Sequence, residues 1–273
     1  ILGLTPDLNG TAAWGVLALA AVIAVATGLL VGAINAFLIN VLKIVPFIAT
    51  LSTFGAAAGF AIIISGGMPL QGPADFSLIN PIVVPGIDRA VFDTGLFSPM
   101  VILMAIVTAI VGLYLHKSRF GLYTYAIGSN AFAARAAGIN VERHITKIYA
   151  LSGALAGLAG MYVYLRLGAG SPSSGTGREL DAIAAVVIGG AALAGGVGRI
   201  LGTALGAIIL FEVQSGLIMV GVDPNWKKVV VAILIAAAVA AQEIQRMAQR
   251  DRFHRIAERV AGCRDLASGD EVA

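Results

Sequence analysis

Six polar or acidic side chains interrupt the most apolar stretches of this chain, and their chemistry is that of solute binding. They are Asn35, Ser52, Thr53, Glu212, Gln214 and Ser215. Amides and hydroxyls can hydrogen-bond the hydroxyl groups of a polar solute, although a Ser or Thr hydroxyl can equally bond the backbone of its own helix. Glu212 is the outlier, because an ionisable group inside an apolar helix is costly and by default functional. A snorkelling or helix-contact role for Glu212 is the alternative.

No pattern of residues in this chain indicates catalysis. None of its lysines follows a glycine, so the phosphate-binding loop GxxxxGK[ST] is absent and we expect no nucleotide or other cofactor on this chain. The three histidines, His116, His144 and His254, have no metal-ligand spacing. We therefore expect that the chain is not an enzyme by itself.

The composition indicates a membrane protein. Of its 273 residues, 58% are hydrophobic and only 12% are charged, and the mean hydropathy is +0.91. A soluble domain carries about 25% charged residues. The single cysteine, Cys263, excludes an intramolecular disulfide.

Seven segments are long and apolar enough to be considered as membrane-spanning helices, which need about 20 residues each. They are Ala12 to Ile39, Pro46 to Ser65, Pro99 to Leu115, Ile145 to Leu165, Leu180 to Ala194, Ile200 to Val220 and Val229 to Gln242. The sequence therefore predicts an all-α membrane protein, a polytopic bundle of about seven helices. The fifth segment is the doubtful one, because a helix from Glu179 to Gly196 reaches only about 27 Å, and a re-entrant or broken helix is its alternative.

Basic residues orient the predicted bundle. The loop 116–147 holds five Lys or Arg residues, and the loop from Gly66 to Ser98 holds Arg89 alone beside three acids. By the positive-inside rule the first loop is cytoplasmic and the second external. The arginine-rich tail 243–273 is then cytoplasmic too, which requires an even number of crossings after Ile145 and favours a true crossing by the fifth segment. The transmembrane domain is thus expected over 1–242.

Two further expectations concern the ends of the chain. Three predicted crossings precede the cytoplasmic loop 116–147, which places Ile1 on the external side. We therefore expect further helices upstream of Ile1. In the tail, Glu243 to Val260 has the pattern of an amphipathic helix that could lie on membrane lipid.

Glycines with small-xxx-small spacing predict close helix packing within the bundle. The pairs are Gly28 with Gly32, Gly55 with Gly59, Gly153 with Gly157, and Gly202 with Gly206.

A short polar helix is predicted in the cytoplasmic loop, in the stretch GSNAFAARAAGI from Gly128 to Ile139. Asn130 can cap its first turn and Gly138 can close it in a left-handed conformation. Two turns of helix are not stable alone in water, so something must pack around them. A plain connector between two helices is the alternative to a docking element.

Three stretches of the chain resemble the permease subunits of ribose- and xylose-type carbohydrate ABC importers. They are GLYTYAIGSNAFAARAAGINV from Gly121, GTGRELDAIAAVVIGGAALAGGVGRILGTALGA from Gly175 and, more weakly, PFIATLSTF from Pro46. The resemblance implies that the polar helix is a coupling helix, with Asn130, Ala133, Ala134, Arg135, Gly138 and Ile139 as its ATPase-coupling residues. It also marks structural signature residues: Gly177, Glu179, Asp181, Gly189, Gly190, Gly195, Gly196, Gly198 and Arg199.

The resemblance implies the partners and the location of the protein. We expect a separate ABC ATPase subunit that binds ATP, an external (periplasmic) solute-binding protein, and a second permease copy or paralogue, in the bacterial cytoplasmic (inner) membrane. No nucleic-acid partner is expected. Family members have about ten crossings, so the resemblance also implies about three helices before Ile1.

Alternatives of two kinds stay open. A branched-chain amino acid ABC permease keeps the architecture and changes the cargo, but the ELDAIAAVV block favours a small carbohydrate such as a pentose. An ion-coupled secondary transporter would require paired acids or basic residues inside the membrane, and only Glu212 is present. Glu179 and Asp181, at the start of the fifth segment, are expected to interact with the helix dipole, with a substrate or binding-protein contact as the alternative.

Overall fold

The computed structural model describes residues 10–71, 99–167, 169–192, 195–223 and 229–242, together with the single positions 226, 244 and 247. The chain forms two compact units, one up to Gly177 and one from Arg178. Most of the predicted external loop, and the predicted amphipathic tail apart from Ile244 and Met247, lie outside the described residues.

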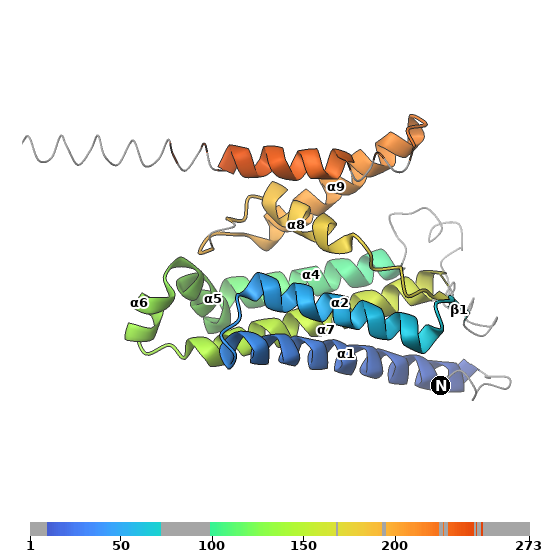
Figure 1. The fold of residues 1–273 in the computed structure, drawn as a ribbon, viewed down its shortest axis with the longest axis horizontal. Helices are drawn as coiled ribbons and strands as arrows, with labels where there is room; N and C mark the ends of the chain where they lie inside the picture. Colours follow the sequence, from blue (N-terminus) through green and yellow to red (C-terminus); the bar gives the residue numbers. More distant parts are fainter. Residues whose placement is uncertain are drawn as a thin grey trace, which may run out of the picture. The chain divides into compact units, whose positions relative to one another are not determined.

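The first unit is a bundle of helices with one short strand pair (Figure 1). Its elements are α1 (Gly10–Asn40), α2 (Pro46–Ser65), β1 (Leu70–Gln71), α4 (Pro99–Lys117), α5 (Arg119–Ser129), α6 (Ala131–Ala136), α7 (Val141–Leu167) and β2 (Ala169–Gly170). The antiparallel pairing of β1 with β2 joins the chain after α2 to the chain after α7.

The second unit contains α8 (Arg178–Ile188), α9 (Ile200–Met219) and an apolar helix over Val229–Gln242. Glycines let α8 and α9 approach closely: a Cβ on Gly206 would overlap the Ala185 carbonyl oxygen, and one on Gly202 would overlap that of Gly189. Ala184, Leu210 and Val231 bring all three helices into one core cluster.

The described residues are those of an all-α membrane protein. Three helical stretches are long and apolar enough to cross a membrane: Ala18–Asn40, Pro46–Ser65 and Ile200–Met219. A fourth candidate is the pair Val101–Lys117 and Arg119–Ser129, which is bent by 71°. Large apolar side chains on α1, α2 and α9 are exposed, as expected of surfaces that face lipid or other helices.

The predicted helices lie close to their expected positions, with one correction. The fifth segment was expected to be helical from Leu180 to Ala194, but α8 ends at Ile188. Gly190 adopts a positive φ of 81°, and the amides of Gly190 and Ala191 bond back to the Val187 and Val186 carbonyls, which terminates the helix. Eleven residues reach about 16 Å, which is too short for a crossing by α8 alone. The crossing that parity favoured stays a prediction.

Glycine contacts hold α1 against α7 between Ala24 and Gly32 on α1 and between Tyr149 and Gly157 on α7. A Cβ on Gly28 would overlap the Gly153 carbonyl oxygen, and a Cβ on Gly153 would overlap that of Gly28. Gly32 meets the Tyr149 carbonyl and Gly157 meets that of Ala24 in the same way. We call Gly28, Gly32, Gly153 and Gly157 the glycine seam.

Three of the four predicted glycine pairs therefore take part in close helix contacts. The exception is Gly55 with Gly59 on α2, where no atom of the described chain lies within 4 Å of an added Cβ.

Helix ends follow from local chemistry. Pro46 occupies the first turn of α2, where its missing N–H costs nothing, and Gly66 closes this helix with a φ of 63°. The bend between α4 and α5 falls at Ser118, whose hydroxyl accepts a hydrogen bond from the Gly121 amide at 3.4 Å. Gly121 is required at this bend because a Cβ there would overlap the Leu115 carbonyl.

A matched pair of substitutions on α7 tests the glycine seam. Gly153→Ala places a methyl group against the α1 backbone, and we expect it to destabilise the protein by about 1–3 kcal/mol because the overlap forces the helices apart. Gly160→Ala, on the same helix, meets no atom of the described residues and should be neutral or stabilising by up to about 1 kcal/mol, through helix propensity. Thermal unfolding in detergent measures both changes in stability. Equal Tm changes for the two variants would contradict the role of the glycine seam in holding α1 against α7.

Candidate functional site

The short helix α6 is capped at its start by Asn130, as the sequence predicted. The Asn130 side-chain oxygen accepts hydrogen bonds from the amides of Phe132 and Ala133, both at 3.0 Å. Asn130 itself is extended, with a φ of −157°, which is the usual conformation of a capping residue. The cap satisfies two donors that a six-residue helix would otherwise leave to water.

The end of α6 is closed by Gly138, also as predicted. Gly138 has a φ of 82°, its amide donates to the Arg135 carbonyl at 2.9 Å, and the Ile139 amide donates to the Ala134 carbonyl at 3.0 Å. A residue with a side chain would be strained in this conformation. Ala134 is buried, with 5% of its surface exposed, so this position of α6 packs against the rest of the unit.

An ion-pair bridge connects α6 to α7 and to the end of α1. The Arg135 guanidinium lies 2.9 Å from the Glu142 carboxylate on the first turn of α7. The same carboxylate oxygen lies 4.0 Å from the Lys43 ammonium, just after α1. All three side chains are about half exposed or more, so the bridge contributes little to stability and mainly fixes the direction of α6.

The start of α7 is fastened to α1 by Asn40. The Asn40 amide donates to the Glu142 carbonyl at 2.9 Å and to the Thr146 hydroxyl at 3.0 Å. Asn140 caps α7, since its side-chain oxygen accepts from the Arg143 amide at 3.0 Å. Three elements thus meet at the first turns of α7.

A fourth element, α5, reaches the same point through His144. This histidine is buried, and its Nε2 lies 2.9 Å from the Thr124 hydroxyl. Its ring packs 4.7 Å from Phe120 and 6.0 Å from Tyr123, measured between ring centroids. Burial, together with the positive charge of Lys147, lowers the pKa of His144 below its ordinary value. We call Asn40, Thr124, Arg135, Glu142 and His144 the joint.

Helices α5 and α6 each carry an exposed apolar side chain. Phe132 on α6 is 83% exposed and Leu122 on α5 is 66% exposed. Figure 1 shows α6 at one end of the first unit, beyond the ends of the long helices. A rigid, capped helix with a protruding aromatic side chain is suited to insertion into a groove on another protein.

The residues predicted to line a solute path fall into two groups. In the first unit, the Thr53 hydroxyl donates to the Asn35 side-chain oxygen at 2.7 Å, whereas the Ser52 hydroxyl bonds its own helix at Ile48. In the second unit, Gln214 is buried and donates to Asp181 at 3.0 Å. Glu212 is exposed and Ser215 half-buried on the same helix. A single path lined by both groups stays a prediction.

The signature residues shape the second unit. Glu179 and Asp181 lie in the first turn of α8, where acids favour the helix dipole, and Asp181 is 3.6 Å from Arg178. Gly189 packs against Gly202. The remaining signature positions are turn or loop residues: Gly177, which ends the first unit, and Gly190, Gly195 and Gly196 have positive φ, a Cβ on Gly198 would lie 3.3 Å from that of Ala191, and Arg199 precedes α9.

Several residues of this arrangement were not anticipated from the sequence. Asn40, Thr124, Glu142 and His144 of the joint were missed, although an Asn at a helix end and an acid in a first turn are signals that point to such contacts. Gln242 was also missed; its amide donates to the Val187 and Ala191 carbonyls at 3.1 and 3.0 Å and so satisfies the end of α8.

Metal binding finds no support in the part of the chain that the structure describes. Within those residues, no group of three or more His, Cys, Asp or Glu side chains is arranged to hold a metal ion.

Three of the known proteins to which this chain is similar are named as permeases for sugars. The chain is 39% identical to the ribose import permease protein of Escherichia coli (strain K12) over 224 residues, which cover 79% of this chain and 66% of that protein. It is 47% identical over 142 residues to the xylose transport system permease protein of Haemophilus influenzae, covering 52% of this chain and 38% of that protein. The galactose/methyl galactoside import permease protein of the same organism is 35% identical, covering 81% of this chain and 65% of that protein.

The chain thus spans less than two thirds of the length of these relatives. No solved structure gives a significant match. Residues 5–239 match the family described as the permease component of the branched-chain amino acid transport system. Because this match covers most of the chain, the protein belongs to that permease family.

Proposed function

We propose that this chain is the permease subunit of an ATP-driven importer for a small carbohydrate, powered by a separate ATPase subunit. The relatives support the cargo class, since their names specify import or transport of ribose, xylose and galactose. The observation that carries the proposal is α6, a capped two-turn helix that projects at one end of the unit and is tied to α7 and the end of α1 through the joint.

The proposed topology places α6 on the cytoplasmic side. The loop 116–147 is rich in Lys and Arg, which favours the cytoplasm, and the ATPase subunit would dock there. The arginine-rich tail would lie on the same side, and a periplasmic binding protein would deliver the solute to the opposite face. A second permease copy or paralogue would complete the pore.

The joint suggests how ATP hydrolysis could reach the membrane helices. If the ATPase moves α6, the Arg135–Glu142 pair transfers the displacement to the first turn of α7. Asn40 and His144 link that turn to α1 and α5 through hydrogen bonds that are partly shielded from water. The four helices would then turn together, which is the rigid-body class of switching motion.

An importer for branched-chain amino acids is the second candidate, because the matching family carries that description. An uptake assay separates the two: the proposed function predicts ATP-dependent uptake of one of ribose, xylose, galactose or fructose, and the second candidate predicts uptake of leucine, isoleucine or valine.

Disruption of α6 tests the docking role. In the full-length permease, the double substitution Ala134→Asp and Gly138→Pro places a charge at a buried position and a proline where φ is 82°. We expect the ATPase subunit to be lost on co-purification, and sugar uptake to fall at least tenfold, while the Tm of the membrane helices changes little.

The control for this experiment is Gly160→Ala on α7, where an added Cβ meets no atom of the described chain, and it should keep both association and uptake. Undisturbed association of the double variant would mean that α6 is only a connector and that the energy source lies elsewhere.

The joint should be sensitive to pH through His144. Its folded-state pKa is lowered by burial and by Lys147, so its contribution to stability is present above the ordinary pKa of about 6.5 and is lost as pH falls through the folded value. We expect the Tm of the purified permease to fall between pH 7.5 and pH 5.5, and the size of that fall to shrink in His144→Gln. An unchanged pH dependence in the variant would contradict the assignment to His144.

A further inference from the structure

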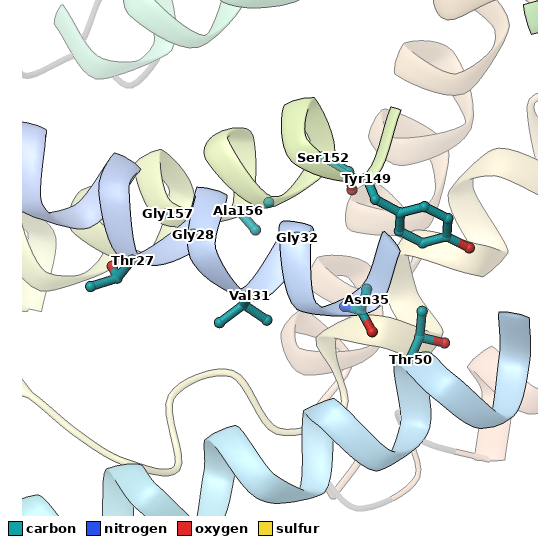
Figure 2. Close-up of a pocket in the computed structure, with 11 residues that line it drawn as sticks. Thr27, Gly28, Val31, Gly32, Asn35, Thr50, Tyr149, Ser152, Ala156 and Gly157 are labelled. Carbon is teal, nitrogen blue, oxygen red and sulfur yellow. The ribbon is translucent and has the colours of Figure 1, made fainter. Parts of the chain in front are cut away.

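A pocket of about 420 Å³ lies between α1, α2 and α7, beside the glycine seam (Figure 2). Its volume falls in the range of about 300–1,000 Å³ that is usual for small-molecule sites. The glycines of the seam form part of its wall. Its polar side chains come from all three helices: Thr27 and Asn35 on α1, Thr50 on α2, and Tyr149 and Ser152 on α7.

Two of these polar groups are already satisfied by the protein. The Thr27 hydroxyl donates to the Ile23 carbonyl at 3.0 Å, and the Thr50 hydroxyl donates to the Pro46 carbonyl at 3.0 Å. This is the usual way in which a hydroxyl is accommodated in an apolar helix. Such groups have little left to offer a ligand.

Three other groups face the pocket without a partner among the described residues. The Asn35 oxygen accepts from Thr53 at 2.7 Å, which leaves its NH₂ group as a donor. The Tyr149 phenol and the Ser152 hydroxyl line the pocket and have no hydrogen bond within the described chain. None of the three groups is fully buried in the described chain, so each is open to a ligand or to water, and within lipid such polar groups need a partner.

We propose that this pocket is a binding site for the neutral, polyhydroxylated solute that the transporter carries. The Asn35 amide would donate to one solute hydroxyl, while the Tyr149 and Ser152 hydroxyls would each donate or accept. Val31, Ala156 and the seam glycines offer an apolar wall for the C–H faces of a sugar ring. This inference rests on the proposed function, because it assigns the cargo of that same permease.

The absence of charge around the pocket selects between the two cargo classes. None of the described residues that line it is acidic or basic. An amino acid would bring an ammonium and a carboxylate group into this setting without a charged partner, which is expensive. A sugar needs only neutral hydrogen bonds, so the pocket fits a monosaccharide and not a branched-chain amino acid.

Thiol labelling of the assembled, full-length transporter tests the site directly. The background is Cys263→Ser, which removes the only cysteine of this chain. Ser152→Cys places a thiol in the pocket, and Leu30→Cys places one outside it, on a surface of α1 that is exposed in the structure and faces lipid in the proposed topology. The probe is a hydrophilic, positively charged thiosulfonate, which reacts with the thiolate form and hence with water-accessible positions.

We expect modification at Ser152→Cys and little at Leu30→Cys, and we expect the transported sugar among ribose, xylose, galactose and fructose to slow modification at least fivefold. Leucine should give no protection. An unreactive Ser152→Cys, a rate that no sugar changes, or protection by leucine would each overturn the assignment.

A second measurement separates this inference from the proposed function. Tyr149→Phe removes one hydroxyl and should raise the KM of ATP-driven sugar uptake about five- to tenfold at unchanged kcat, the effect of one lost hydrogen bond. Tyr162→Phe, the same change elsewhere on α7, should leave KM unchanged. If the unaltered transporter takes up a sugar but the two variants behave alike, the pocket assignment fails; if it takes up no sugar, the proposed function itself fails.

Discussion

The closeness of α1 to α7 is the constraint on which the rest of the first unit depends. Four glycines place the two backbones so near to each other that no side chain fits between them at these positions. In a membrane, where lipid competes for every apolar contact, such close packing is a main source of helix association. Because α1 and α7 cannot separate locally without losing this close packing, we expect the two helices to move together as one rigid body.

Two regions of the α1–α7 pair carry different parts of the proposed mechanism. At one end, Asn40 on α1 donates hydrogen bonds to Glu142 and Thr146 on α7, and the Glu142 carboxylate holds α6 there through Arg135. Along the side, the pocket opens between the pair and α2, with Asn35 and Tyr149 on its walls. A displacement of α6 would therefore move the walls of the pocket without a long chain of intermediate contacts.

Local features of the fold were predictable from the sequence, because they depend on neighbouring residues. The cap by Asn130, the left-handed turn at Gly138 and most helix boundaries are of this kind. The end of α8 was placed too late because apolar residues continue past Gly189 and the hydropathy pattern does not register a glycine turn. Here the backbone conformation of Gly190 outweighs the apolar composition.

Contacts between distant segments were not predictable in the same way. Small-residue spacing indicated which helices approach closely, but it could not identify their partners, and Gly55 with Gly59 shows the same spacing without a neighbour in the described chain. The bonds of Asn40 to Thr146 and of Gln214 to Asp181 join residues 106 and 33 positions apart. Such pairs are set by how the helices pack, which a single sequence does not encode locally.

The most direct test is whether α6 and the α1–α7 pair move as one body during the transport cycle. In the full-length, assembled transporter on the Cys263→Ser background, spin labels at Ala136→Cys on α6 and Leu30→Cys on α1 report their separation by pulsed EPR. The joint predicts the same distance distribution in the nucleotide-free and ATP-trapped states, and a distribution that broadens or shifts between states when Glu142→Gln and Asn40→Ala break the joint. A shift between the two states in the unaltered joint would contradict the account.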